Sequence, residues 1–140
     1  MNNSEINKIY PEKWLGVFCG AYDGTDDGVH NLVRELGKAL AENQIGLVYG
    51  GGGIGVMGTI ADAVLENNGW VMGIVPKNLL ETEMAHTSLD ELVIVETMHE
   101  RKKAMYERAD MFCALPGGLG TLEEVFEATT WTKLKLHTKY

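Results

Sequence analysis

The sequence Gly46-Leu-Val-Tyr-Gly-Gly-Gly-Gly-Ile-Gly-Val-Met-Gly58 joins an apolar run directly to a cluster of glycines and then to a helix-like segment. The glycines remove side chains at the end of a predicted strand, and the first turn of the next helix offers N–H groups without helical partners. This combination favours a phosphate group. We therefore predict a phosphate-binding loop containing Gly51, Gly52, Gly53 and Gly55, with a purely structural turn as the alternative.

Gly53 to Gly58 also matches the G-x-G-x-x-G pattern of dinucleotide-binding proteins. Such proteins need an acidic residue about 20 residues further on, at the end of the next strand. Here that strand ends Gly73-Ile-Val-Pro-Lys77, without an acid. NAD and FAD are therefore disfavoured, and no cofactor is expected. The spacing of His, Cys, Asp and Glu does not suggest a metal site either.

Short apolar segments alternate with helical segments on both sides of this loop. The predicted strands are Trp14–Cys19, Gly46–Tyr49, Trp70–Val75, Leu92–Val95 and Met111–Leu115, and the predicted helices are Asp26–Glu42, Gly55–Glu66, Met98–Ala109 and Thr121–Leu136. Strands that are apolar throughout are expected to be covered on both faces. The alternation predicts an α/β fold, a Rossmann-like doubly wound parallel sheet, in one domain over residues 1–140. The least regular segment, Pro76–Asp90, is expected to form a short helix or an active-site loop.

Charge and composition narrow the class of protein. A net charge of −8 argues against nonspecific binding to nucleic acid or to an anionic membrane. Cys19 and Cys113 lie in apolar runs, which predicts buried thiols outside any disulfide. The N-terminus lacks the apolar core of a signal peptide, and no apolar stretch approaches the roughly 20 residues that span a bilayer. We therefore expect a cytoplasmic protein.

A second glycine cluster follows the last predicted strand, in Cys113-Ala-Leu-Pro-Gly-Gly-Leu-Gly-Thr-Leu-Glu-Glu124. Proline and glycine place a loop at the carboxyl end of that strand, where ligands bind in open α/β sheets. Thr121 to Glu124 reads S/T-x-x-E, so the spacing alone favours Glu124 as half of a capping box. A carboxylate held at a helix start is also kept ionised, ready to accept a proton or to face a cation.

The segment Thr97–Asp110 reads as an amphipathic helix. Met98, Arg101 and Met105 share one face of it. Arg101 therefore lies beside the apolar stripe, and the simplest interpretation is a surface arginine whose stem covers apolar groups. The expected solvated face contains Lys102, Lys103, Glu107 and Arg108.

Together these three stretches resemble the Lonely Guy (LOG) family, the cytokinin riboside 5'-monophosphate phosphoribohydrolases, whose members are often catalogued as possible lysine decarboxylases. The matching residues are Gly50-Gly-Gly52 with Gly55-Val-Met-Gly58, Met98-His-Glu-Arg-Lys102, Pro116-Gly-Gly-Leu-Gly-Thr-Leu-Glu-Glu124 and Thr130-Trp131. The resemblance runs from Gly16 to Tyr140. It implies hydrolysis of the N-glycosidic bond of a purine or cytokinin nucleoside 5'-monophosphate, giving free base and ribose 5-phosphate. It also implies a homodimer with the site near the subunit interface.

The resemblance implies that Arg101 and Glu124 are the catalytic pair. Cleavage of a ribosyl–base bond builds positive charge on the sugar, so Glu124 would stabilise that charge or activate water, and Arg101 would hold the nucleotide or Glu124. Substrate and phosphate would be bound by the two glycine loops and nearby side chains, at Gly51, Gly52, Gly53, Gly55, Gly117, Gly118, Leu119, Gly120, Thr121, Glu83, Met98 and Lys102.

The sequence also departs from the family pattern. Ala21 stands where serine is usual, His30 where an aromatic residue is common, and Lys133 and Lys135 near a usual glutamine and glycine. Family members usually continue beyond position 140 with a further strand and one or two helices, so this chain is expected to lack them. The alternative function is a non-catalytic binding or carrier protein for a phosphorylated nucleotide or pterin cofactor. Lysine decarboxylation has no support in the sequence, because no lysine stands in a recognisable pyridoxal-phosphate setting.

Overall fold

The computed structural model describes residues 8–19, 27–81 and 84–115. In chain order the elements are β1 (Lys13–Phe18), α2 (Asp27–Glu42), β2 (Ile45–Tyr49), α3 (Gly55–Glu66), β3 (Val71–Pro76), the 3-10 helix η1 (Lys77–Leu79), β4 (Glu91–Val95), α4 (Met98–Arg108) and β5 (Met111–Ala114). Each predicted strand and helix in these ranges is present, with ends shifted by one residue at most. The predicted helix Thr121–Leu136 lies outside the described residues.

The five described strands form one parallel sheet in the order β4-β3-β2-β1-β5. The chain moves outward from β1 through β2 and β3 to β4, and then crosses to the other side of β1 to form β5. The strand order therefore reverses beside β1. In sheets of this kind, ligands bind outside the carboxyl ends of the strands near this reversal.

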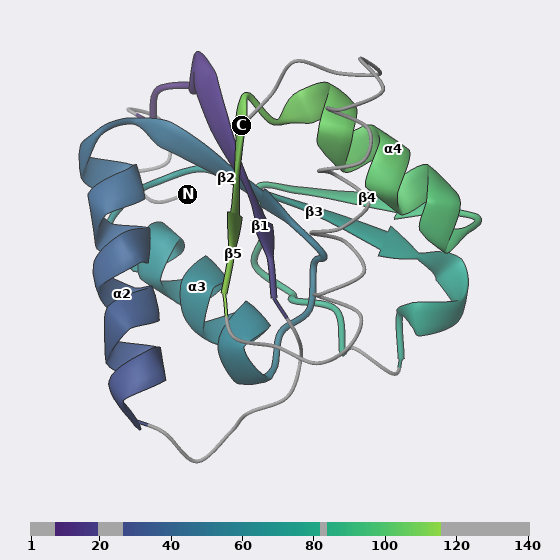
Figure 1. Ribbon diagram of the computed structural model, residues 1–140, viewed down its shortest axis with the longest axis horizontal. Helices are drawn as coiled ribbons and strands as arrows, with labels where there is room; N and C mark the ends of the chain where they lie inside the picture. The colour runs from purple at the N-terminus through teal and green to yellow at the C-terminus, as the bar shows by residue number, and fades with distance from the viewer. Residues whose placement is uncertain (1–7, 20–26, 82–83, 116–140) are drawn as a thin grey trace.

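Helices lie on both faces of the sheet, as predicted for a doubly wound fold (Figure 1). On one face, Leu15 and Val17 of β1 pack in the core cluster that α2 and α3 complete. On the other face, Trp14 and Phe18 pack in the cluster that includes Met105 of α4. Alternate residues of one apolar strand thus enter two separate cores, which explains why β1 carries no polar residue after Lys13.

The prediction that strands are covered on both faces is correct for the centre of the sheet and wrong for its edges. Every residue of β3 is buried, whereas Ile94 of β4 is 54% exposed and Met111 of β5 is 40% exposed. These two strands are the outermost ones of the described sheet, and each pairs with one neighbouring strand within it.

The end of α3 is formed by Asn67-Asn68-Gly69, a sequence typical of a left-handed helix C-cap. Asn68 adopts the left-handed conformation, with φ of 65°. The N–H of Gly69 donates to the carbonyl of Val64 at 2.8 Å, and the N–H of Asn68 donates to that of Leu65 at 3.0 Å. This is the Schellman arrangement, which satisfies the last carbonyls of the helix. Among the described residues, no helix is both long and apolar enough to cross a membrane.

Candidate active site

Arg101 lies in the first turn of α4 and is buried, with 5% of its surface exposed. Its Nε donates to the carbonyl of Ile74 at 2.9 Å, and its Nη2 donates to the carbonyl of Gly50 at 2.6 Å. The interpretation as a surface arginine is therefore wrong. The guanidinium joins α4 to β3, through Ile74, and to the carboxyl end of β2, through Gly50, which directly follows the last residue of that strand.

The start of α4 is fixed by two side-chain caps that differ from a standard capping box, because Glu100 binds the N–H of the residue before the N-cap Thr97. The Thr97 side chain accepts from the N–H of Glu100 at 3.1 Å, and Glu100 Oε2 accepts from the N–H of Glu96 at 2.9 Å. The signal was present as Thr97-Met-His-Glu100, which is S/T-x-x-E. Because Arg101 is the next residue, this cap sets the direction in which its side chain leaves the helix.

Three glycines of the loop are explained by contacts with the protein itself. A Cβ at Gly50 would lie 2.0 Å from Arg101 Nη2, and one at Gly51 would lie 2.3 Å from a methyl carbon of Val75. Gly51 also has φ of 81°, a conformation that favours glycine. A Cβ at Gly53 would lie 2.8 Å from the carbonyl oxygen of Met84. The structural alternative therefore accounts for these glycines without a ligand.

Residues 84–88, here called the strap, pair with the glycine loop. The N–H of Gly53 donates to the carbonyl of Met84 at 2.8 Å, and the N–H of His86 donates to the carbonyl of Gly51 at 2.9 Å. Between these bonds, Gly52 and Ala85 form an antiparallel bridge. The N–H of Gly53, which the sequence predicted as a phosphate donor, is thus engaged by the strap. No periodic pattern in the sequence indicates this pairing.

The N-terminus of α3 presents N–H groups next to this loop. Ile54 is the N-cap, and within the described residues no side chain caps the helix and no acidic residue lies in its first turn. The first-turn residues Gly55, Val56 and Met57 carry N–H groups for which an α-helix supplies no acceptor. An anion here gains roughly 0.3–1 kcal/mol from the helix dipole at the surface, and more when partly buried.

The structure brings some of the predicted site residues together. Arg101 contacts Gly50, its Nη1 lies 3.6 Å from the sulfur of Met98, and Lys102 follows on the same helix, half-buried. The remaining predicted residues lie outside the described ranges: Glu83, Gly117, Gly118, Leu119, Gly120, Thr121 and Glu124. Cys19 and Cys113 are thiols, but they are half-buried rather than fully buried.

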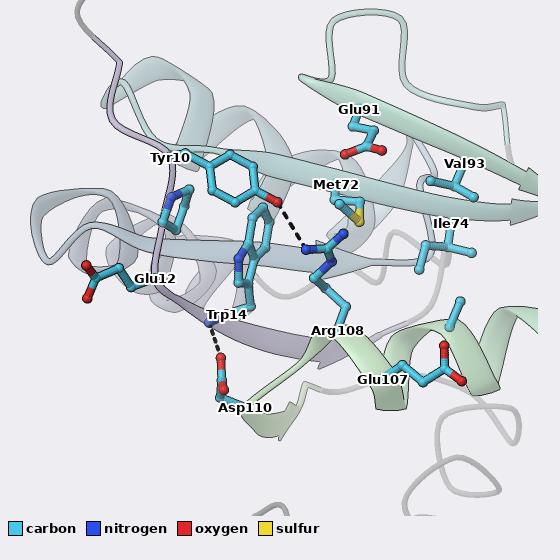
Figure 2. Close-up of a pocket in the computed structure, with 12 residues that line it drawn as sticks. Tyr10, Glu12, Trp14, Met72, Ile74, Glu91, Val93, Glu107, Arg108 and Asp110 are labelled. Atoms are coloured by element: carbon cyan, nitrogen blue, oxygen red, sulfur yellow. Dashed lines mark hydrogen bonds between the residues drawn. The ribbon is translucent and has the colours of Figure 1, made fainter.

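A separate cavity of about 560 Å³ lies on the α4 face of the sheet (Figure 2). Its lining includes Trp14 and Arg108. The backbone N–H of Trp14 donates to Asp110 Oδ2 at 2.8 Å, and Arg108 Nη1 donates to the Tyr10 hydroxyl at 3.0 Å. Glu12 directly precedes β1 and Glu91 begins β4, so this cavity lies toward the amino ends of the strands. It is therefore at the opposite end of the sheet from the glycine loop.

Comparison with known proteins shows which family model and which curated proteins this chain is similar to. A family model described as "Possible lysine decarboxylase" matches residues 57–139. The chain is 46% identical over 123 residues to the cytokinin riboside 5'-monophosphate phosphoribohydrolase LOG2 of Arabidopsis thaliana, covering 88% of this chain and 58% of the relative. It is also 46% identical over 128 residues to the cytokinin riboside 5'-monophosphate phosphoribohydrolase of Rhodococcoides fascians, covering 91% and 65%.

A solved structure supports the fold independently. The molybdenum cofactor binding protein of Rippkaea orientalis superposes with a TM-score of 0.74 over 89% of this chain and 75% of its own, at 23% identity. At that identity the likeness shows the fold alone. The chain spans 58% and 65% of the lengths of the two curated relatives named above. The match of the family model over residues 57–139 settles the family: this chain belongs to the Lonely Guy family, whose model carries the description of possible lysine decarboxylases.

Proposed function

We propose that this chain hydrolyses the N-glycosidic bond of a purine or cytokinin nucleoside 5'-monophosphate, releasing free base and ribose 5-phosphate. One observation carries the proposal. The buried cation of Arg101 is fixed against the carbonyl of Gly50, and the same loop leads directly to the N-terminus of α3, which no side chain of the described residues caps. Two positive features thus meet at the carboxyl ends of the strands, where a phosphorylated ligand is expected. Both named relatives carry this activity in their names.

The substrate phosphate is assigned to the first turn of α3. Because the N–H of Gly53 is engaged by Met84, the donors proposed for the phosphate are those of Gly55, Val56 and Met57, with Gly51 and Gly52 beside them. Each hydrogen bond from a backbone N–H to a phosphate oxygen is charge-assisted and therefore stronger than one to a neutral acceptor.

Arg101 is proposed as a fixed cation rather than a proton donor. A guanidinium offers N–H donors and no acceptor, and two of the N–H groups of Arg101 are held by main-chain carbonyls. Its position is thus set before substrate arrives, which is the condition for electrostatic stabilisation without reorganisation. Its charge would hold the nucleotide or the carboxylate of Glu124.

Glu124 is proposed as the group that acts at the sugar. β5 ends at Ala114, and β1 lies between β5 and β2, so the chain leaves β5 about 10 Å from the end of β2 at the usual strand spacing. In the reaction, water attacks C1' of the ribose and the C1'–N bond breaks. The base leaves with the bonding electron pair and a proton. A carboxylate would accept the proton of water or stabilise the positive charge that builds on the sugar.

The decisive experiment is a base-release assay on the 140-residue chain. The substrates are adenosine 5'-monophosphate, an N6-prenylated adenosine 5'-monophosphate and other purine nucleoside monophosphates. We expect release by the wild type and a loss of at least about 100-fold in Glu124→Gln with nucleotide binding retained. Glu123→Gln, one residue away, is the matched control.

Three outcomes would contradict the proposal. Equal base release by Glu124→Gln would remove the assigned role of that residue. Tight nucleotide or pterin binding without turnover would favour a carrier protein. Release of carbon dioxide from lysine by protein containing pyridoxal phosphate would favour a decarboxylase.

The molecular organisation is proposed on the resemblance to the family. We propose a single domain over residues 1–140 that forms a homodimer, with the site near the subunit interface and the protein in the cytoplasm. Sedimentation equilibrium measures the assembly, and a monomer at micromolar concentration would contradict it. The cellular location is tested by fractionation of the source cells.

A further inference from the structure

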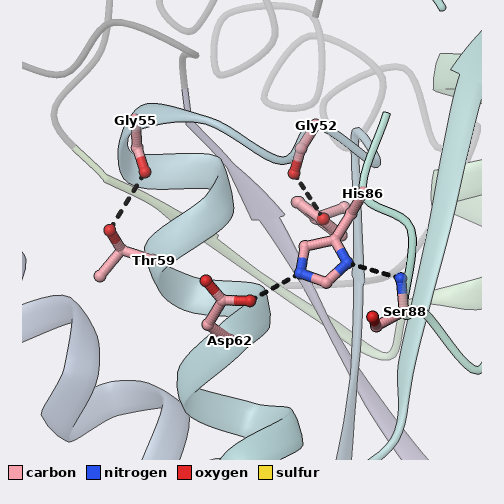
Figure 3. A network of polar contacts seen from close by, with 7 residues as sticks. Gly52, Gly55, Thr59, Asp62, His86 and Ser88 are labelled. Carbon is pink, nitrogen blue, oxygen red and sulfur yellow. Dashed lines mark hydrogen bonds and ion pairs between the residues drawn. The ribbon is translucent and has the colours of Figure 1, made fainter. Parts of the chain in front are cut away.

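The His86 ring is held on both of its nitrogens. His86 Nε2 lies 2.6 Å from Asp62 Oδ1 on α3, and His86 Nδ1 lies 3.0 Å from the N–H of Ser88 (Figure 3). The backbone N–H of Ser88 can only donate, so Nδ1 is the acceptor. The hydrogen of a neutral ring therefore resides on Nε2 and is donated to the carboxylate of Asp62.

The backbone and the side chain of His86 bind on the two sides of the bend between the glycine loop and α3. The N–H of His86 donates to Gly51 in the loop before α3, while the ring bonds to Asp62 two turns into α3. His86 therefore bridges the loop and the helix across the bend that joins them. Gly53 lies inside this bridge, and its N–H is taken by Met84 of the same strap.

A loop built of glycine has no side chains with which to hold its own shape. Glycine also loses more conformational freedom on ordering than other residues. The fixed geometry of Gly51, Gly52 and Gly53 must therefore come from groups outside the loop. The carbonyl of Gly52 is held by the Tyr49 hydroxyl at 2.7 Å, and the strap adds hydrogen bonds to Gly51 and Gly53.

We propose that His86 and Asp62 are positioning residues that hold the glycine loop and the first turn of α3 in the geometry that binds the 5'-phosphate. This inference rests on the proposed function, because it assigns the phosphate to that turn. The pair acts through the backbone and does not touch the reacting atoms. Its loss is expected to weaken recognition of the phosphate rather than to slow bond cleavage.

The exposed fractions of the His86 and Asp62 side chains indicate that Asp62 can be replaced with little effect on global stability. The His86 side chain is 10% exposed, but that of Asp62 is 57% exposed. A carboxylate so exposed contributes little to global stability. Removing it is expected to loosen the strap locally while the cores on both faces of the sheet stay intact.

Four variants separate the contributions of the pair. Asp62→Ala removes the carboxylate. His86→Asn keeps an acceptor near Nδ1 for the N–H of Ser88 but is too short to reach Asp62. His86→Gln extends an N–H toward the position of Nε2 and is the rescue variant. Glu66→Ala removes another exposed acid of α3 and is the matched control for charge.

Steady-state kinetics with a nucleoside 5'-monophosphate provide the first readout. In Asp62→Ala and His86→Asn we expect KM to rise about fivefold with kcat within about twofold, the size of effect that an exposed charged hydrogen bond supports. His86→Gln is expected to recover most of the KM, and Glu66→Ala to match the wild type. An unchanged KM in both Asp62→Ala and His86→Asn, or a fall in kcat alone, would overturn the inference.

Binding and amide exchange test the same variants without turnover. By calorimetry, Asp62→Ala and His86→Asn should bind adenosine 5'-monophosphate about fivefold more weakly, with affinity for adenosine unchanged. By hydrogen exchange, the amides of Gly53 and His86 should lose protection while that of Val48 in β2 keeps it. Equal nucleotide affinity and equal protection in all variants would overturn the inference. A wild-type chain that binds the nucleotide but never cleaves it would overturn only the proposed function.

Discussion

The guanidinium Nη2 of Arg101 donates to the carbonyl of Gly50 across 2.6 Å, between residues 51 positions apart in the chain. The same nitrogen lies 2.0 Å from where a Cβ at position 50 would stand. The glycine is therefore required by the arginine, and the two sequence motifs that contain them form one structural unit. This unit ties β2, β3 and α4 together near the carboxyl ends of the strands, where the site is proposed.

Arg101→Met is expected to destabilise the fold as well as abolish base release. The substitution leaves the buried carbonyls of Gly50 and Ile74 without their donor, and each unsatisfied group costs about 1–3 kcal/mol. We expect the free energy of unfolding to fall by about 2–4 kcal/mol, measured by urea denaturation. Lys103→Met, an exposed position on the same helix, should change it by less than about 0.5 kcal/mol. Equal stability of the two variants would contradict the structural role of the guanidinium.

Gly50→Ala is expected to displace the Arg101 side chain. The added methyl group would also lie 2.5 Å from the terminal methyl of Met57, and overpacking of this kind costs typically about 1–3 kcal/mol. Because Gly50→Ala and Arg101→Met both disturb the contact between residues 50 and 101, their effects on the free energy of unfolding should not add. In the double variant with Arg101→Met, the alanine should cost much less than it does alone, and a thermodynamic cycle measures this coupling. Additive free energies would show that the two residues do not depend on each other.

Thr97→Ala is expected to weaken the start of α4. The substitution removes the hydroxyl that accepts from the N–H of Glu100, and losing such an N-cap costs typically about 1 kcal/mol. Denaturation midpoints report the loss, and Thr97→Ser should retain most of the stability because serine keeps the acceptor. Since Arg101 lies in the first turn of the helix that this cap begins, we also expect reduced base release in Thr97→Ala. If the alanine and serine variants melted together, the cap would have no energetic role.

Burial raises the pKa of the Cys113 thiol above its usual value. The thiolate is the reactive form, so alkylation of Cys113 in the folded protein should be slow at pH 7. The rate should rise about tenfold per pH unit in the alkaline range, until the pKa is reached. Peptide mass spectrometry after treatment with iodoacetamide follows the rate, with urea-unfolded protein as the reference. Equal rates for folded and unfolded protein at pH 7 would contradict the shift.

The raised pKa of Cys113 determines how the stability of the fold changes with pH. The unfolded chain loses the Cys113 proton at a lower pH than the folded chain. The contribution is therefore constant below the pKa of the unfolded thiol, and stability falls as pH rises above it. Cys113→Ser should reduce this alkaline loss.

Local patterns in the sequence determined the elements and their order. The run from Gly46 to Gly58 contains a buried strand, a tight loop and a helix start, and α3 begins at Gly55 as predicted. Asn67-Asn68-Gly69 ended the same helix through backbone hydrogen bonds within six residues. Hydrophobic periodicity and turn chemistry act over such short separations, so the sequence contains them directly. The exposure of Ile94 and Met111 was missed because apolar runs do not report which strands lie at the edges.

The candidate site was predicted in part. The sequence identified Arg101 and the glycine loop, but from spacing alone it favoured an exposed arginine. The resemblance to the Lonely Guy family implied a catalytic role for Arg101, but it did not show which groups Arg101 contacts. It gave no indication of the strap, of the bond between the N–H of Gly53 and Met84, or of His86.

The sequence by itself determined the α/β alternation, the loop at the end of β2 and the family. Only the tertiary structure decided that Arg101 is buried, that Gly50 leaves space for a guanidinium, and that His86 reaches Asp62. The reason is physical. Each of these contacts joins residues between 24 and 51 positions apart, on elements whose relative placement is set by the parallel sheet and its two cores. No local pattern contains that placement, because it exists only once the elements have packed.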